Sequence, residues 1–164
     1  MPLFTAFAPP AIEFRLARSG AKVVVVADED QRAKLDPGGG LPGEPPWRVI
    51  SGSRHPGDVP LAEMMSTDGT APRVEPAVTG PAAPLVLIFT SGTTGAPKGV
   101  PVPVRALAGI SCYMEFGLDA QPEDVYWNAA DPGWAYGLFY AILGPLATGR
   151  RSILLHAGFS PALT

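Results

Sequence analysis

The stretch Thr90-Ser91-Gly92-Thr93-Thr94-Gly95-Ala96-Pro97-Lys98-Gly99 decides how this chain is interpreted. It follows an apolar run at residues 85–89, which predicts a buried strand. The glycines allow close approach of the backbone, and their amides can point at one anion. The hydroxyl groups of Ser91, Thr93 and Thr94 add hydrogen-bond donors, and Lys98 adds a mobile positive charge. A strand followed by such a loop predicts a phosphate-binding site.

The spacing of this loop excludes two other phosphate loops. A Walker loop needs Gly-Lys followed by Ser or Thr, whereas here Pro97 precedes Lys98 and Gly99 follows it. The dinucleotide fingerprint G-x-G-x-x-G is absent, and the prolines at 101 and 103 prevent a helix from starting directly after the loop. The competing interpretation is an ordinary mobile surface loop with a solvated lysine.

Residues 90–99 resemble the phosphate-loop signature of the adenylate-forming (AMP-binding) superfamily. They match its pattern Thr-Ser-Gly-Thr/Ser-Thr-Gly-x-Pro-Lys-Gly at every fixed position. Residues 124–137, DVYWNAADPGWAYG, are similar to the family's next block as it occurs in acetyl-CoA synthetase-like members. Residues 2–9, 11–16 and 19–25 also resemble that branch. The resemblance therefore runs in order across almost the whole chain.

The resemblance implies an ATP-dependent acyl-CoA synthetase, which is an AMP-forming acid–thiol ligase that uses ATP with Mg²⁺ and takes coenzyme A as co-substrate. Such an enzyme activates a short or medium carboxylic acid as an acyl-adenylate, and either coenzyme A or a carrier-protein thiol accepts the acyl group. The residues implied to hold the ATP phosphates are Thr90, Ser91, Gly92, Thr93, Thr94, Gly95 and Lys98. The segment implied to line the acyl pocket is Trp134, Ala135, Tyr136 and Gly137.

Packing in a hydrophobic core competes with the pocket interpretation of Trp134, because six of the fourteen aromatic residues lie between Tyr126 and Tyr140. We expect Trp134 to form a wall of the pocket. Tyr136 is larger than the residue found there in many relatives. Core packing is the expectation for the other four aromatic residues of this stretch, which are Tyr126, Trp127, Phe139 and Tyr140.

The resemblance also predicts that the chain is an internal part of a larger N-terminal domain, truncated at both ends. The family's later blocks do not occur: the Tyr-Gly-x-Thr-Glu block for adenine, the Thr-Gly-Asp block for ribose, the Gly-Arg hinge and the C-terminal lid domain with its lysine. No catalytic residue is therefore assigned on this chain. The alternative function is a catalytically inactive, truncated or nucleotide-binding fragment.

The amino-acid composition indicates which broad class of protein this chain belongs to. The chain has 164 residues, a net charge of −3, 46% hydrophobic and 16% charged residues, which is typical of a globular domain. The absence of a basic stripe argues against a nucleic-acid partner. One cysteine and two isolated histidines predict neither a disulfide nor a metal site. No apolar stretch reaches membrane length, so we expect no membrane partner and a cytoplasmic location.

Helical and strand-like patterns alternate along the chain and predict an α/β fold, a mostly parallel layered sheet flanked by helices. This agrees with the large N-terminal domain of the adenylate-forming fold. Within one partial domain, 1–164, the parts are first αβ units (1–70), a linker (71–84), the strand and phosphate loop (85–103), and a helix, strand and acyl-pocket segment (104–164). The predicted helices are 11–19, 28–35, 59–65, 104–116 and 138–146, and the predicted strands are 23–26, 48–50, 85–89, 125–127 and 152–155.

Four smaller assignments follow from local context. The acids at 28–30 are expected at a helix start, where they complement the helix dipole. Asp131 precedes Pro-Gly and is expected to cap a turn rather than act as a base. His55 is expected to be a solvated loop residue, and Cys112 to be buried on the apolar face of a helix.

Overall fold

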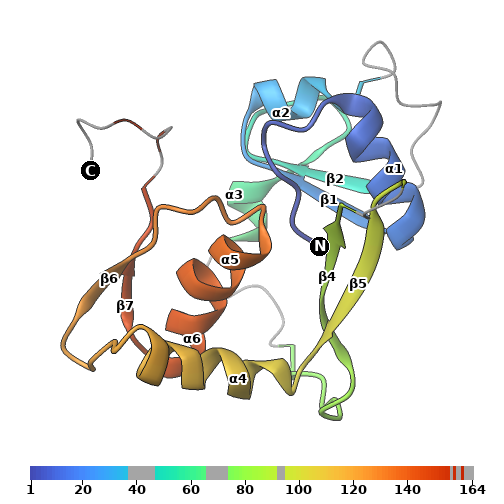
Figure 1. Ribbon diagram of the computed structural model, residues 1–164. Helices are drawn as coiled ribbons and strands as arrows, with labels where there is room; N and C mark the ends of the chain where they lie inside the picture. Colours follow the sequence, from blue (N-terminus) through green and yellow to red (C-terminus); the bar gives the residue numbers. More distant parts are fainter. Residues whose placement is uncertain (37–46, 66–73, 92–94, 156, 158–159, 161–164) are drawn as a thin grey trace. The chain divides into compact units, whose positions relative to one another are not determined.

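The computed structural model describes residues 1–36, 47–65, 74–91, 95–155, 157 and 160 (Figure 1). Its contacts divide the chain into two compact units. Thr5–Val78 is called the N-terminal unit below, and Met1–Phe4 together with Thr79–Thr164 is called the C-terminal unit. The division falls inside the stretch 71–84 expected to be a linker. The finer four-part organisation stays a prediction.

The N-terminal unit is built around a three-stranded parallel sheet in the order β1-β2-β3. Its elements are α1 (Pro9–Ser19), β1 (Val23–Val26), α2 (Glu29–Ala33), β2 (Arg48–Ser51), β3 (Val59–Pro60) and α3 (Leu61–Met64). Every predicted element of this half is present. The helix expected at 59–65 begins two residues later, because Val59 and Pro60 pair with β2 instead.

Local sequence explains why these elements form. Helix α1 has proline in its first turn, buries Ile12 and Leu16, and ends at Gly20, whose φ of 61° lies in the left-handed region that glycine adopts most easily. Helix α2 begins at Asp28, whose Oδ1 accepts a hydrogen bond from the backbone amide of Gln31 at 2.9 Å. The acidic helix start predicted from the sequence is therefore confirmed.

Strand β1 differs from the prediction in one respect. Four consecutive valines predict a strand buried on both faces, as in a covered parallel sheet. In the structure Val24 and Val26 are buried, whereas Val23 and Val25 are exposed. One face of β1 therefore packs on the core of the unit, whereas its other face is exposed.

The C-terminal unit contains two separate two-stranded sheets and a helical layer. Its elements are β4 (Pro84–Thr90), β5 (Lys98–Pro103), α4 (Ala106–Cys112), the π-helical turn η2 (Tyr113–Gly117), β6 (Val125–Trp127), α5 (Ala135–Gly137), the π-helical turn η3 (Leu138–Leu143), α6 (Gly144–Thr148) and β7 (Arg151–Ile153). Strands β6 and β7 are parallel. Helix α4 packs against α6 and η3 (Figure 1).

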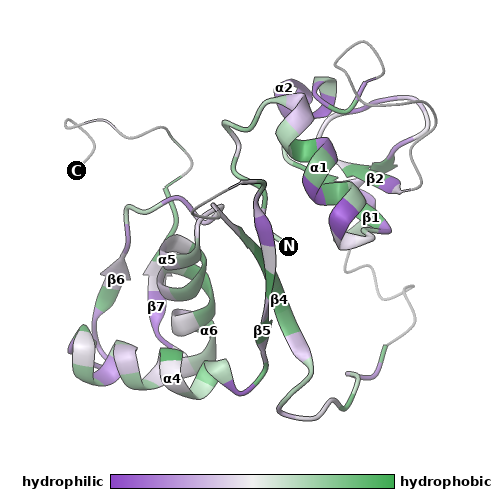
Figure 2. Ribbon diagram, turned by 45° about the vertical axis from the view of Figure 1, so that its right-hand side comes forward, coloured by the Kyte–Doolittle hydropathy of each residue, from purple (hydrophilic) through white to green (hydrophobic). Residues whose placement is uncertain are grey.

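Strand β5 was not predicted, and it forms an antiparallel hairpin with β4. The hydrophobic residues of β4 stand out in Figure 2, yet only Ile88 is buried, so the prediction of a buried strand at 85–89 holds for the strand and not for its burial. The other strand pairings in the described residues are parallel. The α/β class with a mostly parallel sheet is confirmed.

Met114 is the centre of the core of this unit, with no exposed surface. It packs against Gly144, where a Cβ atom would come within 2.7 Å of the Met114 sulfur. Two expectations are wrong here. Cys112 is exposed, because the helix turns Ile110 and Met114 inward instead. Trp127 is also exposed, and the three other aromatic residues expected in the core, Tyr126, Phe139 and Tyr140, are only half-buried.

Candidate functional site

The hairpin β4–β5 forms the base of the expected phosphate loop. Thr90 pairs with Lys98 across the two strands. In an antiparallel pair, directly opposite side chains lie on the same face of the ladder, with Cβ atoms about 5 Å apart. The hydroxyl group of Thr90 and the ammonium group of Lys98 therefore start from one side of the hairpin.

The next pair along the hairpin, Phe89 and Gly99, fixes how closely the strands pack. A Cβ atom at Gly99 would lie 3.4 Å from the Phe89 ring and 3.3 Å from Leu87 Cδ1. The separation from Leu87 is slightly tighter than an ordinary van der Waals contact, and that from Phe89 is at its lower limit, so the two apolar side chains lie over the space that glycine leaves open. At the end of the hairpin, the apolar side chains of Leu87 and Phe89 therefore pack over Gly99 on the face opposite to Thr90 and Lys98.

The loop itself is partly described. Gly92, Thr93 and Thr94 lie outside the described residues. Ser91 and Gly95 are exposed. Among the described residues, no atom other than those of Gly95 and its chain neighbours lies within 4 Å of the position that a Cβ atom of Gly95 would take. Lys98 is exposed as well. Of the seven residues expected at the phosphates, the structure thus brings Thr90 and Lys98 onto one face of the β4–β5 hairpin. A hydroxyl and an ammonium group so placed can bind an anion.

The segment expected at the acyl pocket begins with a turn that Asp131 holds. Its Oδ1 accepts a hydrogen bond from the backbone amide of Gly133 at 2.6 Å, and its carbonyl accepts one from the amide of Trp134 at 3.1 Å. The prediction that Asp131 caps a turn is confirmed. The turn leads directly into α5, whose buried Gly137 lies against the Asp131 carbonyl.

The four residues of this segment have different surroundings. The Trp134 ring is about half exposed and lies 5.5 Å from the Phe4 ring, centroid to centroid. Ala135 is half-buried and Tyr136 is exposed. Gly137 is buried, and it has no room for a side chain, because a Cβ atom there would lie 2.6 Å from the carbonyl oxygen of Ala130. Trp134 and Tyr136 thus offer aromatic surface on one short segment, whereas Gly137 serves packing.

A cluster of tyrosines beside this segment was not anticipated from the sequence. The ring centroids of Tyr136 and Tyr140 are 4.8 Å apart, and those of Tyr113 and Tyr140 are 4.6 Å apart. The spacing of 136 and 140 on one predicted helix indicated the first contact. No local pattern indicates the contact with Tyr113, which comes from another element.

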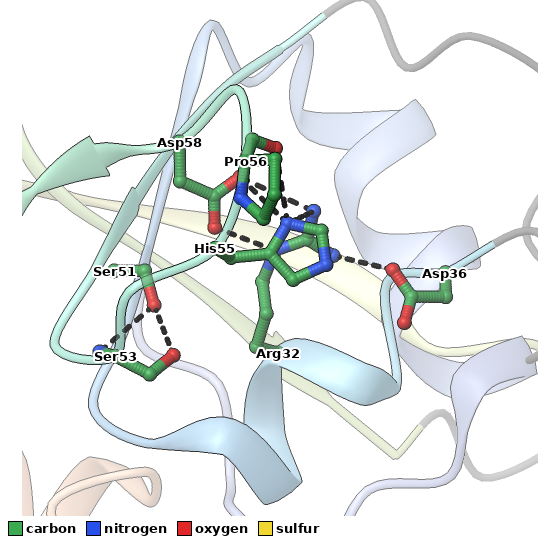
Figure 3. Close-up of polar contacts among 7 residues, drawn as sticks. All are labelled: Arg32, Asp36, Ser51, Ser53, His55, Pro56 and Asp58. Atoms are coloured by element: carbon green, nitrogen blue, oxygen red, sulfur yellow. Dashed lines mark hydrogen bonds and ion pairs between the residues drawn. The ribbon is translucent and has the colours of Figure 1, made fainter.

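The N-terminal unit contains a polar network that the sequence analysis also missed (Figure 3). Arg32, only 9% exposed, donates from Nε to Asp58 Oδ2 at 2.6 Å and from Nη1 to Asp36 Oδ1 at 2.7 Å. The pKa of Arg32 is raised, first by the hydrogen bonds to Asp58 and then by the charges of both aspartates. Desolvation lowers it, but by less than these effects raise it. This network ties α2 to the segment that follows β2.

His55 belongs to the same network. It lies in a loop as expected, but it is half-buried and contacts Arg32 instead of being fully solvated. Its Nδ1 lies 3.2 Å from Arg32 Nη2 and 3.1 Å from the Pro56 carbonyl oxygen, so the ring tautomer decides which contact is a hydrogen bond. Next to it is a cleft of about 570 Å³. Its lining includes Ser53, Arg54, His55 and Glu63. Arg32 and Asp58 are 26 positions apart, which is why no sequence pattern revealed the pair.

Within the described ranges, no helix is long and apolar enough to cross a membrane. Over the same ranges, no group of three or more His, Cys, Asp or Glu side chains is arranged to hold a metal ion. The cytoplasmic location expected from the sequence stays a prediction.

Comparison with protein families and curated proteins gives consistent matches. A family model described as "AMP-binding enzyme" matches residues 1–163. The acetyl-coenzyme A synthetase of Bacillus subtilis is 33% identical over 161 residues, which is 98% of this chain and 28% of that protein. That of Pseudoalteromonas atlantica is 33% identical over 172 residues, or 93% of this chain and 26% of that protein. The chain therefore spans about a quarter of the length of the curated relatives that it matches.

Solved structures give the same answer for the fold. An acyl-CoA synthetase of Brucella canis has 41% sequence identity and a TM-score of 0.81, over 97% of this chain and 28% of that one. An anthranilate CoA ligase, solved in complex with anthranoyl-AMP, has a TM-score of 0.77 at 20% identity, over 95% of this chain and 30% of that one. At that identity the second likeness concerns the fold alone.

Proposed function

Because the chain belongs to the AMP-binding enzyme family, we propose that it supplies the phosphate-binding and acyl-binding segments of an ATP-dependent, AMP-forming acyl-CoA synthetase. A longer protein that contains this chain is called the parent enzyme below. In our proposal it activates a short or medium carboxylic acid with ATP and Mg²⁺ and passes the acyl group to coenzyme A. The relatives named acetyl-coenzyme A synthetase support this substrate range.

The proposed reaction has two steps. A carboxylate oxygen attacks the α-phosphorus of ATP, the bond to the β-phosphate oxygen breaks, and pyrophosphate leaves. The sulfur of coenzyme A then attacks the acyl carbon, and AMP leaves with the oxygen that joined it to the acyl group. The first step builds negative charge on the departing β- and γ-phosphates, so donors fixed in advance near those oxygens lower its barrier.

One observation carries the assignment of residues, namely the cross-strand pair of Thr90 and Lys98 at the end of the β4–β5 hairpin. The ammonium group of Lys98 supplies positive charge to the β- and γ-phosphates in this proposal, and the hydroxyl group of Thr90 donates a hydrogen bond from the same side. Exposed Ser91 and Gly95 continue that surface into the loop. Gly92, Thr93 and Thr94 are proposed to bind with them on the strength of the sequence alone. The acyl chain is proposed to lie against Trp134, Ala135, Tyr136 and Gly137.

The test is acid-dependent release of pyrophosphate by the parent enzyme. Replacing Lys98 with alanine removes the cation while keeping the hairpin, and we expect kcat for adenylation to fall by about 10²–10³-fold, as for loss of one preorganised donor. Lys22→Ala is the matched control, because Lys22 is exposed in the N-terminal unit and is assigned no role. Unchanged pyrophosphate release by Lys98→Ala would contradict the assigned role.

A second candidate is a nucleotide-binding fragment with no turnover of its own. The observation that favours it is coverage, since the chain matches only 26–28% of the length of the curated relatives. It is tested on the 164-residue chain alone, by calorimetric titration with MgATP and by a pyrophosphate assay. We expect no detectable turnover in the isolated chain, and robust turnover would overturn this candidate.

A further inference from the structure

The cleft beside His55 lies at the carboxyl edge of the parallel sheet in the N-terminal unit. Ser51 and Pro60 pair at the ends of β2 and β3, and both line the cleft, whose volume is about 570 Å³. Much of the remaining lining comes from residues 52–58, called the cleft segment below. Ligands of parallel sheets bind outside the carboxyl ends of the strands, in clefts of about 300–1,000 Å³. The place and the size of the cleft therefore suit a small ligand.

The cleft segment is fixed at both ends by contacts with other elements. At its start, the Gly52 amide donates a hydrogen bond to the Val26 carbonyl oxygen at 3.0 Å. Gly52 has no room for a side chain, because the carbonyl oxygen of Ala27 lies against it. At the other end, Asp58 accepts two hydrogen bonds from Arg32 (Figure 3). A segment held in this way loses little conformational entropy when a ligand binds.

Ser53 has a hydroxyl proton available for such a ligand. Ser51 Oγ accepts a hydrogen bond from the Ser53 backbone amide at 3.1 Å and lies 2.8 Å from Ser53 Oγ. Only 1% of Ser51 is exposed, so its own proton needs an acceptor within the protein, and in the described part of the chain Ser53 Oγ is that acceptor. Ser51 therefore donates to Ser53. The proton of Ser53, which lines the cleft, is left for another group.

The charged side chains that line the cleft are Arg54, Asp58 and Glu63. The side chain of Asp58 is 5% exposed, and Arg32 compensates its charge. Arg54 and Glu63 are exposed, and neither forms an ion pair with another described residue. The cleft thus offers one positive and one negative charge to a ligand.

Another part of the lining is apolar and includes Pro60 and Leu61, both half-buried. A ligand that suits all of these groups carries a carboxylate for Arg54, an ammonium group for Glu63 and an apolar body. A carboxylate or phosphate without an ammonium group would face the negative charge of Glu63 unpaired. The charges of the cleft therefore favour a zwitterion over a simple anion.

We propose that this cleft binds a free amino acid with an apolar side chain. Arg54 and the hydroxyl group of Ser53 bind its carboxylate, and Glu63 binds its ammonium group. Its side chain lies against Leu61, and the ring of His55 forms part of the wall. The inference goes beyond the proposed function, since it uses none of the residues assigned to ATP or to the acyl group.

The first test measures binding of radiolabelled L-leucine to the parent enzyme by equilibrium dialysis, with unlabelled L-leucinamide and N-acetyl-L-leucine as competitors. The amide lacks the carboxylate charge, and the acetyl compound lacks the ammonium charge. We expect saturable binding of L-leucine and at least about tenfold weaker binding of each analogue, as for loss of one charge-assisted hydrogen bond. Absence of saturable L-leucine binding overturns the inference, as does equal affinity for all three compounds.

Variants of the parent enzyme assign the two charges. Arg54→Gln should weaken L-leucine binding at least about tenfold and bring its affinity close to that of L-leucinamide, because the contact that distinguishes these two ligands is lost. Glu63→Gln should do the same relative to N-acetyl-L-leucine. Arg48→Gln and Glu29→Gln replace exposed residues outside the cleft and are the matched controls, with wild-type affinity expected. Unchanged L-leucine binding in Arg54→Gln or Glu63→Gln overturns the assignment, and so does weaker binding of all three compounds by the same factor.

Amide hydrogen exchange of the parent enzyme locates the ligand and does not depend on activity. We expect L-leucine to slow exchange in peptides that contain residues 51–63, in wild type and in both controls but not in Arg54→Gln. Protection of residues 134–137 with 51–63 unchanged would place the amino acid at the proposed acyl segment and overturn the inference. A parent enzyme that binds L-leucine in the cleft but releases no pyrophosphate with any acid refutes the proposed function alone.

Discussion

Gly137 shows how one residue can decide whether the expected acyl segment forms. It lies inside α5, where alanine would normally stabilise the helix by about 0.5–1 kcal/mol relative to glycine. A Cβ atom at this position would overlap the carbonyl oxygens of Asp131 and Ala130. Because these are backbone atoms of a hydrogen-bonded turn, they cannot move aside without breaking it. Steric overlap therefore outweighs helix propensity here.

We expect Gly137→Ala to lower the free energy of unfolding by about 2 kcal/mol, as for other overpacked sites. Urea unfolding followed by circular dichroism at micromolar concentration measures it. Gly109→Ala is the matched control, since Gly109 lies in α4 with no atom within 4 Å of the added methyl, and it should be neutral or slightly stabilising. Equal stability changes in the two variants would contradict the steric argument.

Asp58 is the second decisive residue, because it holds the buried guanidinium of Arg32 with two hydrogen bonds. Its side chain is 5% exposed, against 43% for Asp36. Removing one partner of a buried ion pair leaves the other charge poorly compensated. We expect Asp58→Asn to cost about 2 kcal/mol, since Asp36 still binds Arg32, and Asp36→Asn to cost less than about 1 kcal/mol. A larger loss in Asp36→Asn, by the same unfolding measurement, would refute this ranking.

Among the elements, those with strong local signals were predicted and those defined by a partner were not. The helix at α1 carries its own start and stop signals, and the valines of β1 encode a strand. Strand β5 contains two prolines and a glycine, which predict irregular structure from the sequence alone. It forms a strand because it pairs with β4. The contact of Asp58 with Arg32 was equally invisible, since it depends on how β2 and α2 are placed by the fold.

The tyrosines of α5 and η3 make the stability of the folded chain depend on pH. The pKa values of Tyr136 and Tyr140 are raised in the folded chain. A group with a raised pKa binds its proton more tightly when folded, so its contribution to stability is complete below the unfolded value near 10 and is lost as the pH rises through the folded value. Stability should therefore fall between pH 10 and the raised values.

We expect the double variant Tyr136→Phe/Tyr140→Phe to show a shallower fall over this window than wild type. Urea unfolding at half-unit steps from pH 8 to pH 11 provides the comparison. Parallel curves for the two proteins would show that these phenols ionise alike in the folded and unfolded chain, contrary to the expectation.

At the scale of the whole molecule, the described surface carries many large apolar residues. They include Val25 on β1, Phe116 on η2, Leu146 on α6 and Ile153 on β7. The short sheets also leave strand edges unpaired among the described elements. Exposed apolar area and open strand edges both favour association between chains.

We expect the isolated 164-residue chain to self-associate as its concentration rises and to bind a hydrophobic dye. Light scattering coupled to size-exclusion chromatography from about 5 to 200 µM measures the first property, spanning the concentrations at which exposed apolar surface and strand edges drive aggregation. Fluorescence of the dye measures the second. A monomer at every concentration, with a single sharp thermal transition and no dye binding, would contradict the expectation.

The register of the β4–β5 hairpin has one more mechanical consequence. Thr90 and Lys98 are opposite each other in one ladder. If the hairpin tilts as a unit, the backbone positions that carry the hydroxyl and the ammonium group therefore move together. The distance between these two backbone positions is then unchanged, whereas their distances to a bound anion change together. Removing one residue between 98 and 103 would instead turn every following side chain of that strand to the opposite side.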